Sequence, residues 1–353
     1  RGRIWRSRTV LTLAALWAGY ATGHLLLSGR WWPLLIPDVA PPIVFVAVPP
    51  FLLLAAAAIR RLRRHVVACV VLALAAGCPS AGLRPAALWA RGDGPAPAGA
   101  PHVVSWNPEY WDQADDPDRF YAFLKAQRAD VYLIQEFLYM MPSGPRPVPD
   151  LDRLRREFSG YHIATVGELL TLSRFPIVAE YPLDAGALPP DGNDWHDYWP
   201  NKILRTDLRM AGRTLSVYNV HIPVQFDTGS SPLSPAFYRV VRESNARRQP
   251  QLRALARDVA DNHNPVLVSG DFNSSPAMGD MRGLPDGLHD ALRASTSLYP
   301  RSWPVAGLPM LWRLDWTFTT ADVRVHRYQF GDPQRFSDHR TQDMVISLRK
   351  EPR

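Results

Sequence analysis

The sequence predicts an α+β protein in which an N-terminal three-helix transmembrane region precedes a domain of mixed α and β layers. Two observations support this fold class. The first 90 residues hold three long apolar segments with basic residues at their ends. From residue 102 onward, short apolar runs that end in turn residues alternate with helical patterns, which is typical of packed α and β layers. A chain of 353 residues can also build a substantial core and more than one domain.

Three apolar segments near the N-terminus are predicted to cross a membrane. They cover about residues 10–27, 41–59 and 66–83. Each is close to the length of about 20 residues that a helix needs to cross the hydrocarbon layer. Buried core helices are one alternative, and a cleavable signal peptide is another. Both are disfavoured, because the three segments occur together with basic flanks and two of them follow the first.

Arginines at the ends of these segments predict the orientation of the chain. They precede the first segment and separate the second from the third: Arg1, Arg3, Arg6, Arg8, Arg60, Arg61, Arg63 and Arg64. Because cytoplasmic flanks carry the excess of basic residues, both groups are expected in the cytoplasm. The third segment then leads outward. We therefore expect a multi-pass protein of the cell membrane, with the lipid bilayer as a partner and the remaining domain extracytoplasmic.

A linker is predicted between the membrane anchor and the rest of the chain. Residues 91–101 are rich in Gly, Ala and Pro. The ten residues 92–101 reach at most about 35 Å when fully extended. The predicted organisation is therefore a membrane anchor over residues 1–90, the linker over 91–101, and a domain over 102–353 that stays close to the bilayer.

Short apolar runs and helical patterns define the predicted elements of this domain. The runs that indicate strands are His102–Ser105, Val131–Ile134, Leu215–Val220, Val266–Ser269 and Met344–Leu348. The helical patterns between them are Pro117–Gln127, Asp150–Phe158 and Ala246–Asn262.

The end of one predicted strand carries the most informative motif, Ser269-Gly270-Asp271-Phe272-Asn273. Residues two apart on a strand point to the same face, so Asp271 and Asn273 can converge on one point. A carboxylate can take a proton from water, and an amide can hold that water or a phosphate oxygen. A capped turn is the alternative explanation for such a sequence.

Similar polar clusters follow other apolar runs. They are Ser105-Trp106-Asn107, Leu133-Ile134-Gln135-Glu136, Tyr218-Asn219-Val220-His221, Arg313-Leu314-Asp315-Trp316 and Ser337-Asp338-His339. In this order, the set resembles the endonuclease/exonuclease/phosphatase superfamily over about residues 101–350. Members hydrolyse phosphate esters with a divalent metal. The resemblance implies a four-layer α/β-sandwich with two facing mixed, mostly antiparallel sheets and the site at one edge.

Metal ligands are expected among the acidic and amide residues of these clusters. Glu136 follows an apolar strand, where an unpaired charge is costly and a hard divalent cation would compensate it. The resemblance implies that Glu136 is the main ligand of Mg²⁺ or Mn²⁺, with Asn107 beside it and Asp338 at the metal edge. Whether Glu109 also reaches the metal is open. A surface carboxylate beyond the strand is the alternative for Glu136.

Catalytic roles follow from the same resemblance. Asp271 orients or deprotonates the attacking water, and Asn273 positions it. His339 donates to a phosphate oxygen as charge develops, and Asp315 orients this histidine.

A second histidine is expected to take part in the reaction. His221 resembles the family histidine that contacts phosphate or protonates the leaving oxygen, and Asn219 shares its strand face. A core histidine bonded to the backbone is the alternative.

The charge distribution disfavours nucleic acid as a partner. The chain has a formal charge of +7, and its first 90 residues carry ten Arg and one Asp, or +9, which leaves −2 for the remainder. A domain that grips long polyanions normally carries its own basic stripe. The sequence does not indicate the oligomeric state.

An amphiphilic phosphate-containing lipid is the substrate we expect. Residues 194–200 are rich in aromatics and residues 303–312 form an apolar loop, both of which suit lipid contact or else cover the core. The anchor and domain together are similar to the teicoplanin-resistance membrane proteins of actinobacteria. This resemblance implies hydrolysis of a diphosphate lipid such as undecaprenyl diphosphate, linked to cell-wall synthesis or glycopeptide resistance. The alternatives are a phospholipid or sphingomyelin phosphodiesterase, an extracytoplasmic nuclease and a catalytically silent binding domain.

Overall fold

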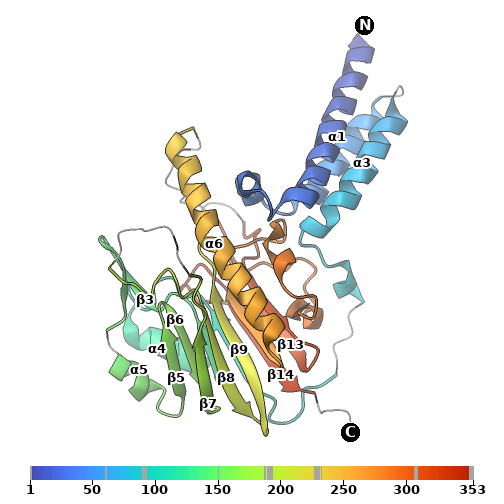
Figure 1. Ribbon diagram of the computed structural model, residues 1–353. Helices are drawn as coiled ribbons and strands as arrows, with labels where there is room; N and C mark the ends of the chain where they lie inside the picture. Colours follow the sequence, from blue (N-terminus) through green and yellow to red (C-terminus); the bar gives the residue numbers. More distant parts are fainter. Residues whose placement is uncertain are drawn as a thin grey trace.

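The computed structural model describes residues 2–349 except 60–61, 90–93, 150, 187, 189–193, 226–230, 232 and 306–308. Parts of several predictions therefore lie outside the described residues: Arg1, Arg60 and Arg61 of the basic flanks, residues 91–93 of the linker, Asp150, and residues 306–308 of the apolar loop. In the described part, a bundle of helices extends away from a domain built on two sheets (Figure 1).

The bundle consists of α1 (Gly2–Leu27), α2 (Val44–Ala57) and α3 (Arg63–Gly77), with the short 3₁₀-helices η1 (Trp32–Leu35) and η2 (Pro37–Val39) before α2. Among the described residues, two helices are long and apolar enough to cross a membrane, over residues 4–27 and 63–80. The segment from η1 to α2 is bent by 67°, and it makes a third crossing only if the bent pair is one span. The predicted outer spans thus coincide with helices, and the number of crossings remains a prediction.

Apolar side chains cover the outside of the bundle. Leu16, Phe51 and Leu54 are each at least 65% exposed, although they are large and apolar. Their inner neighbours are small, and Ala14, Val66 and Val70 pack together between the helices. A surface of this kind is not stable in water and is suited to contact with lipid.

The domain contains two six-stranded sheets and a small hairpin. The first sheet has the order β13 (Val323–Gly331), β14 (Thr341–Leu348), β1 (His102–Trp106), β2 (Val131–Ile134), β6 (Leu169–Ser173), β5 (His162–Val166). The second has the order β11 (His289–Asp290), β12 (Asp315–Thr319), β10 (Val266–Asp271), β9 (Arg213–His221), β8 (Ile203–Met210), β7 (Ile177–Pro182). The hairpin joins β3 (Leu138–Met141) to β4 (Gly144–Pro147).

The two sheets share one pattern of pairing. In each, only the central pair is parallel, β1 with β2 and β9 with β10, and the flanking pairs are antiparallel. The predicted mixed, mostly antiparallel sheets are therefore present. All five predicted strands are also present, and each lies within or close to an observed one.

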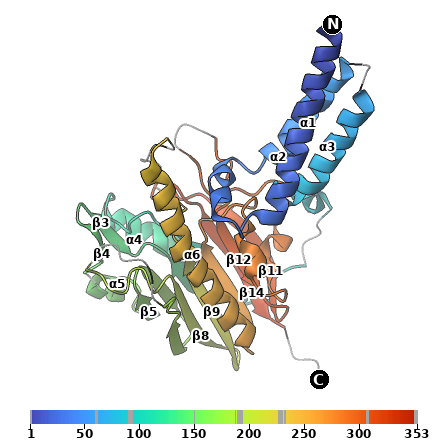
Figure 2. The ribbon, with the colours of Figure 1, turned by 45° about the horizontal axis from the view of Figure 1, so that its top comes forward.

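The main core lies between the two sheets. Val103 and Leu133 from the first sheet pack with Leu215, Val217 and Leu267 from the second. Helices α4 (Pro117–Ala126) and α5 (Leu151–Glu157) contribute to a second cluster on the outer side of the first sheet. Helix α6 (Pro235–Asp261) covers the outer side of the second sheet (Figure 2). This layering fixes the positions of the strand ends from which the site is built.

A glycine is required where the central pair of the second sheet ends. Gly270 has φ +155°, and a Cβ atom there would lie 1.9 Å from the carbonyl oxygen of Val220 on β9. Only glycine allows the two strands to approach so closely directly before Asp271. The register then places Asp271 beside His221 on one side and Asp315 on the other.

Candidate active site

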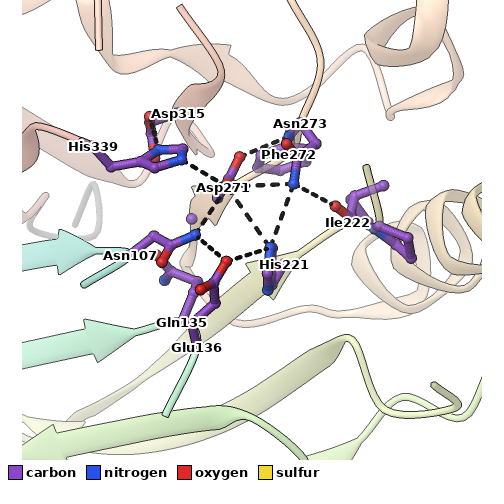
Figure 3. A network of polar contacts seen from close by, with 12 residues as sticks. Asn107, Gln135, Glu136, His221, Ile222, Asp271, Phe272, Asn273, Asp315 and His339 are labelled. Carbon is purple, nitrogen blue, oxygen red and sulfur yellow. Dashed lines mark hydrogen bonds and ion pairs between the residues drawn. The ribbon is translucent and has the colours of Figure 1, made fainter. Parts of the chain in front are cut away.

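Seven of the nine predicted site residues meet at one edge of the two sheets. Figure 3 shows them as a connected polar cluster: Asn107, Glu136, His221, Asp271, Asn273, Asp315 and His339. They come from the ends of the central strands of both sheets, from the start of β12 and from the loop before β14. Parallel central pairs place these ends at the same edge, which is why residues distant in sequence converge there.

Asn107 connects the two sheets through its amide. Its Nδ2 donates to Glu136 Oε1 at 2.9 Å and to Asp271 Oδ2 at 3.2 Å. The loop that follows holds this arrangement, since Glu109 N donates to Asn107 Oδ1 and Tyr110 N donates to Glu136 Oε2. Both loop residues have positive φ, +58° and +70°. Non-glycine residues adopt this conformation at an energetic cost, and such residues often occur at functional sites.

Burial shifts the pKa of the two carboxylates that Asn107 contacts. It raises the pKa of Glu136, and His221 partly opposes the shift. It also raises the pKa of Asp271, an effect that His339 opposes and Asp315 reinforces. Both carboxylates would therefore gain from a cation placed between them.

The predicted pair of Asp271 and Asn273 forms a tight loop at the end of β10. Asn273 N donates to Asp271 Oδ1 at 2.8 Å, and Asn273 Nδ2 donates to the carbonyl of Ile222 at 3.0 Å. Asn273 has φ +46°, a conformation that asparagine tolerates better than most residues. The other carboxylate oxygen, Asp271 Oδ2, faces the cluster.

His339 is held by a buried carboxylate, as predicted. Its Nδ1 lies 3.0 Å from Asp315 Oδ2, and its Nε2 lies 3.5 Å from Asp271 Oδ2. Burial alone would lower the pKa of His339, but Asp315 and Asp271 together raise it well above its usual value. The ring is therefore a proton donor aimed at the centre of the cluster.

His221 has the same arrangement, with a partner that the sequence analysis missed. Its Nδ1 lies 2.9 Å from Oε1 of Glu168, and its Nε2 lies 3.7 Å from Asp271 Oδ2. Glu168 is fully buried and also forms an ion pair with Lys202. Burial alone would raise the pKa of Glu168, but His221 and Lys202 lower it to about 2. A carboxylate directly before the apolar run of β6 is the signal that could have indicated this residue.

Asn219 does not belong to the cluster, and this corrects its predicted catalytic role. Its Nδ2 donates to the carbonyls of Ile134 and Leu170 in the first sheet at 2.9 and 3.0 Å. Its Oδ1 accepts from Gln135 Nε2 at 2.6 Å. These bonds use both N–H donors and engage the amide oxygen, so Asn219 joins the two sheets beneath the site.

Asp338 lies at the rim and not with the other predicted metal ligands. Its side chain is 38% exposed, and its Oδ1 is 3.8 Å from His339 Nε2. Its Oδ2 accepts a 2.6 Å hydrogen bond from Trp303 Nε1, in the apolar loop. Glu109 lies close to Asp338, and burial together with this charge raises the pKa of Glu109. The rim thus combines two carboxylates with an indole.

The donor set fits a hard divalent cation. Glu136 and Asp271 supply carboxylate oxygens, and Asn107 would supply an amide oxygen if its amide were turned over. Ligand atoms of Asp271, Asp315 and His339 also lie within 4.8 Å of one another. However, Asp315 and His339 already bond to each other, which favours the side of Asp271 that faces Glu136 as the position of the ion.

Solved structures that match this chain cover about 70% of its length. A humanized D. rerio TDP2 is 14% identical, with a TM-score of 0.51, over 70% of this chain and 98% of that chain. An endonuclease/exonuclease/phosphatase from Bacteroides vulgatus is 16% identical, with a TM-score of 0.49, over 70% and 99%. Sphingomyelinase C from Streptomyces griseocarneus is 16% identical, with a TM-score of 0.46, over 70% and 99%. At these identities the likeness shows the fold alone.

The family is shown by the sequence itself. No curated protein matches the chain. The model of the endonuclease/exonuclease/phosphatase family, in contrast, matches residues 99–339, which is well over half of the chain and includes every residue of the cluster. The chain is therefore a member of the endonuclease/exonuclease/phosphatase family of hydrolases.

Proposed function

We propose that this protein is a divalent-metal-dependent hydrolase that acts at the outer face of the membrane on a diphosphate lipid such as undecaprenyl diphosphate. One observation carries the hydrolytic part. Two histidines, each with a carboxylate at Nδ1, aim Nε2 at the same oxygen of Asp271, at 3.5 and 3.7 Å. A buried acceptor between two donors is the arrangement needed to activate water beside a phosphate group.

The residues of the cluster divide the reaction between them. Asp271 accepts a proton from the attacking water, and Asn273 positions that water. His339 donates to a non-bridging phosphate oxygen, and His221 protonates the leaving oxygen. Mg²⁺ or Mn²⁺, held by Glu136 and Asn107 beside Asp271, would supply charge neutralisation at the phosphoryl group. Water attacks phosphorus in line, and no covalent enzyme intermediate is required.

The contacts between anchor and domain support a lipid substrate. Trp312 Nε1 donates to the carbonyl of Val39, in the bent segment of the anchor, at 2.9 Å. Trp312 pairs with Trp303, whose ring centroid is 6.3 Å from that of His339. Two neighbouring tryptophans thus form a path from the anchor to the rim of the site. A substrate with an apolar tail in the bilayer and a phosphate at the headgroup level would follow this path.

The proposed setting combines the anchor with the family chemistry. The two candidate spans suggest membrane association, and we propose a multi-pass protein with an extracytoplasmic catalytic domain. The resemblance to the teicoplanin-resistance membrane proteins supports a role in cell-wall synthesis or glycopeptide resistance. A phosphatase reporter fused after Arg353 tests the orientation, and it is expected to be active. An inactive reporter there, with an active one fused near Arg61, would reverse the topology.

A substrate panel tests the proposal. The full chain in detergent is given undecaprenyl diphosphate, sphingomyelin and DNA, each with Mg²⁺. We expect release of inorganic phosphate from the diphosphate lipid and none from the Asp271→Asn variant. Release of choline phosphate from sphingomyelin alone would instead support the phosphodiesterase alternative, and cleavage of DNA alone the nuclease. Mg²⁺ binding with no turnover of any of the three would support a silent binding domain.

A further inference from the structure

A cavity outside the active site lies where the anchor meets the domain. Its volume is about 210 Å³. One wall is the turn Ser28–Arg30 after α1, a second is the middle of α6 around Arg253, and a third is the segment 279–284, which includes η5 (Gly279–Gly283). Anchor and domain therefore build this cavity together, and neither part forms it alone.

Three arginines with exposed side chains line the cavity: Arg30, Arg253 and Arg282. Within the described part of the chain, no carboxylate lies within ion-pair distance of these three, whereas the neighbouring Arg248 is paired with Asp280. Arg282 Nη1 donates to the carbonyl of Leu25 at the end of α1, at 2.5 Å, and to the carbonyl of Ser28 at 3.5 Å. Three cations without counterions around one cavity give it a positive potential, which attracts anions.

The acidic group in the same walls is already neutralised. Asp280 Oδ2 accepts from Arg248 Nη2 at 2.5 Å and from Ser274 Oγ at 2.9 Å, and all three side chains are buried. The carboxylate is therefore compensated from within the domain. It does not cancel the charge of the three arginines that face the cavity.

The walls of the cavity are fixed against each other by a very close backbone approach. A Cβ atom on Gly279 would lie 1.9 Å from the carbonyl oxygen of Ser28, and one on Gly29 would lie 2.4 Å from the carbonyl carbon of Gly279. Ser28 Oγ accepts from Gly279 N at 2.9 Å and donates to buried Asp38 at 2.7 Å. The backbone walls of the cavity are thus already in place before an anion binds, which lowers the cost of binding.

The position of the cavity along α1 matches the depth of lipid headgroups. The apolar part of α1, residues 10–27, has a length of about 27 Å at 1.5 Å per residue. This is close to the hydrocarbon thickness of about 30 Å. If α1 crosses the membrane, Leu27 lies at the edge of the hydrocarbon, and Ser28–Arg30 lies among the headgroup phosphates.

From these observations we propose that the cavity binds the phosphate group of an anionic membrane lipid. Arg30, Arg253 and Arg282 contact the phosphate oxygens, and the acyl chains lie along α1. The site is separate from the hydrolytic centre, and the lipid bound there is not the substrate. The proposal rests on α1 crossing the membrane and does not depend on which phosphate compound the active site hydrolyses.

Native mass spectrometry of the full chain in detergent with added phosphatidylglycerol tests this site. The variant Arg30→Gln/Arg253→Gln/Arg282→Gln is compared with Arg155→Gln/Arg156→Gln/Arg209→Gln, which removes the same charge from exposed positions on α5 and β8. We expect the first variant to bind the lipid at least about tenfold more weakly than the wild type, since charge-assisted hydrogen bonds are lost. The second variant should bind as the wild type does. If the triple variant folds poorly, the single variant Arg253→Gln is measured in its place. It should also bind the lipid more weakly than the wild type.

Two competing ligands distinguish a lipid phosphate from free phosphate. The Asp271→Asn variant distinguishes this proposal from the hydrolase proposal. Phosphatidylcholine and inorganic phosphate, at matched concentration, should displace little phosphatidylglycerol. Complete displacement by inorganic phosphate would contradict a lipid site in favour of a free anion. Equal loss in both triple variants would also overturn the site, because it would show non-specific charge attraction. The Asp271→Asn variant should retain the lipid, so failure of the hydrolase proposal leaves this result unchanged.

Discussion

Asp315 and His339 form the pair that sets the direction of the site, with Nδ1 of the imidazole 3.0 Å from Oδ2 of the carboxylate. Asp315 is fully buried and begins β12, so the carboxylate cannot move without disturbing the second sheet. The pairing leaves Nε2 of His339 as the only ring nitrogen that can serve the substrate. Glu168 and His221 form a similar pair on the other side of Asp271. Asp271 therefore has two oriented histidines beside it.

Replacing Asp315 by Asn should cost activity while the fold remains. The amide keeps the shape of the carboxylate but no longer holds the charge that raises the pKa of His339. We expect kcat to fall by about 10²–10⁴-fold, the range for a general acid or base that loses its role. Steady-state phosphate release measures this, with Asp322→Asn, an exposed carboxylate beyond β12, as the control. Comparable rates in both variants would remove the orienting role from Asp315.

Replacing Glu168 by Gln should reduce both activity and stability. Lys202 and His221 would remain buried without their shared counterion, and breaking a buried pair in this way costs about 3–5 kcal/mol. The matched control is Glu157→Gln, whose partner Lys125 is 48% exposed, and such surface pairs contribute about 0–1 kcal/mol. Urea unfolding of the full chain in detergent gives both values. Equal destabilisation by the two substitutions would contradict the buried pair.

The effect of Glu168→Gln on stability should depend on pH. The pKa of Glu168 is about 2 in the folded chain, below its usual value of 4.5. A lowered pKa stabilises the folded state fully above pH 4.5, and this contribution is lost as pH falls toward 2. The difference in unfolding free energy between wild type and Glu168→Gln should therefore shrink over this range. A difference that stays constant with pH would argue against the ion pair.

The pairing of His102 with Asp343 should stabilise the fold at neutral to mildly acidic pH. Its Nε2 lies 2.8 Å from Asp343 Oδ2 on β14, and this hydrogen bond raises the pKa of His102. A raised histidine pKa stabilises the folded state fully at pH values below the unfolded pKa of 6.5. This contribution disappears as pH rises through the pKa of the folded state. The variant His102→Gln should therefore lose more stability at pH 6 than at pH 9. The exposed His263→Gln serves as the control, and an equal loss at both pH values for His102→Gln would refute the pairing.

Contact between anchor and domain should depend on Gly279. A Cβ atom there would clash with the carbonyl of Ser28, whereas one on Gly283, in the same 3₁₀-helix, would meet nothing within 4 Å. We expect Gly279→Ala, but not Gly283→Ala, to lower the thermal midpoint of the full chain and to expose residues 274–283 to proteolysis. An unchanged midpoint for Gly279→Ala would show that the anchor does not dock in this way.

Much of the site could be predicted because its residues follow continuous apolar runs. Strands such as β2 and β10 are buried on both faces, so their composition alone indicates them, and the polar residues at their ends stand out. Strands β8 and β13 carry charged residues among apolar ones and were missed. Helix α6 begins at Pro235, because Ser234 accepts from Ala236 N, well before the predicted start at Ala246.

Other features depend on contacts that a sequence pattern does not contain. Asn219 and His221 share a strand face, but two residues along a strand is a step of about 7 Å, which places Asn219 below the site. Glu168 acquires its role only when β6 and β9 lie against each other. The predicted linker indicated only that the domain stays close to the bilayer, whereas the structure shows that Ser28 and Val39 of the anchor bond directly to the domain.

Metal dependence is the most direct test of the central claim that Glu136, Asn107 and Asp271 form one hydrolytic centre. The measurement is phosphate release from undecaprenyl diphosphate by the full chain after treatment with EDTA, followed by titration with Mg²⁺. We predict no release without the ion, full recovery with it, and a much higher Mg²⁺ requirement for Glu136→Gln. Full release in EDTA, or the same Mg²⁺ requirement in wild type and Glu136→Gln, would contradict the account.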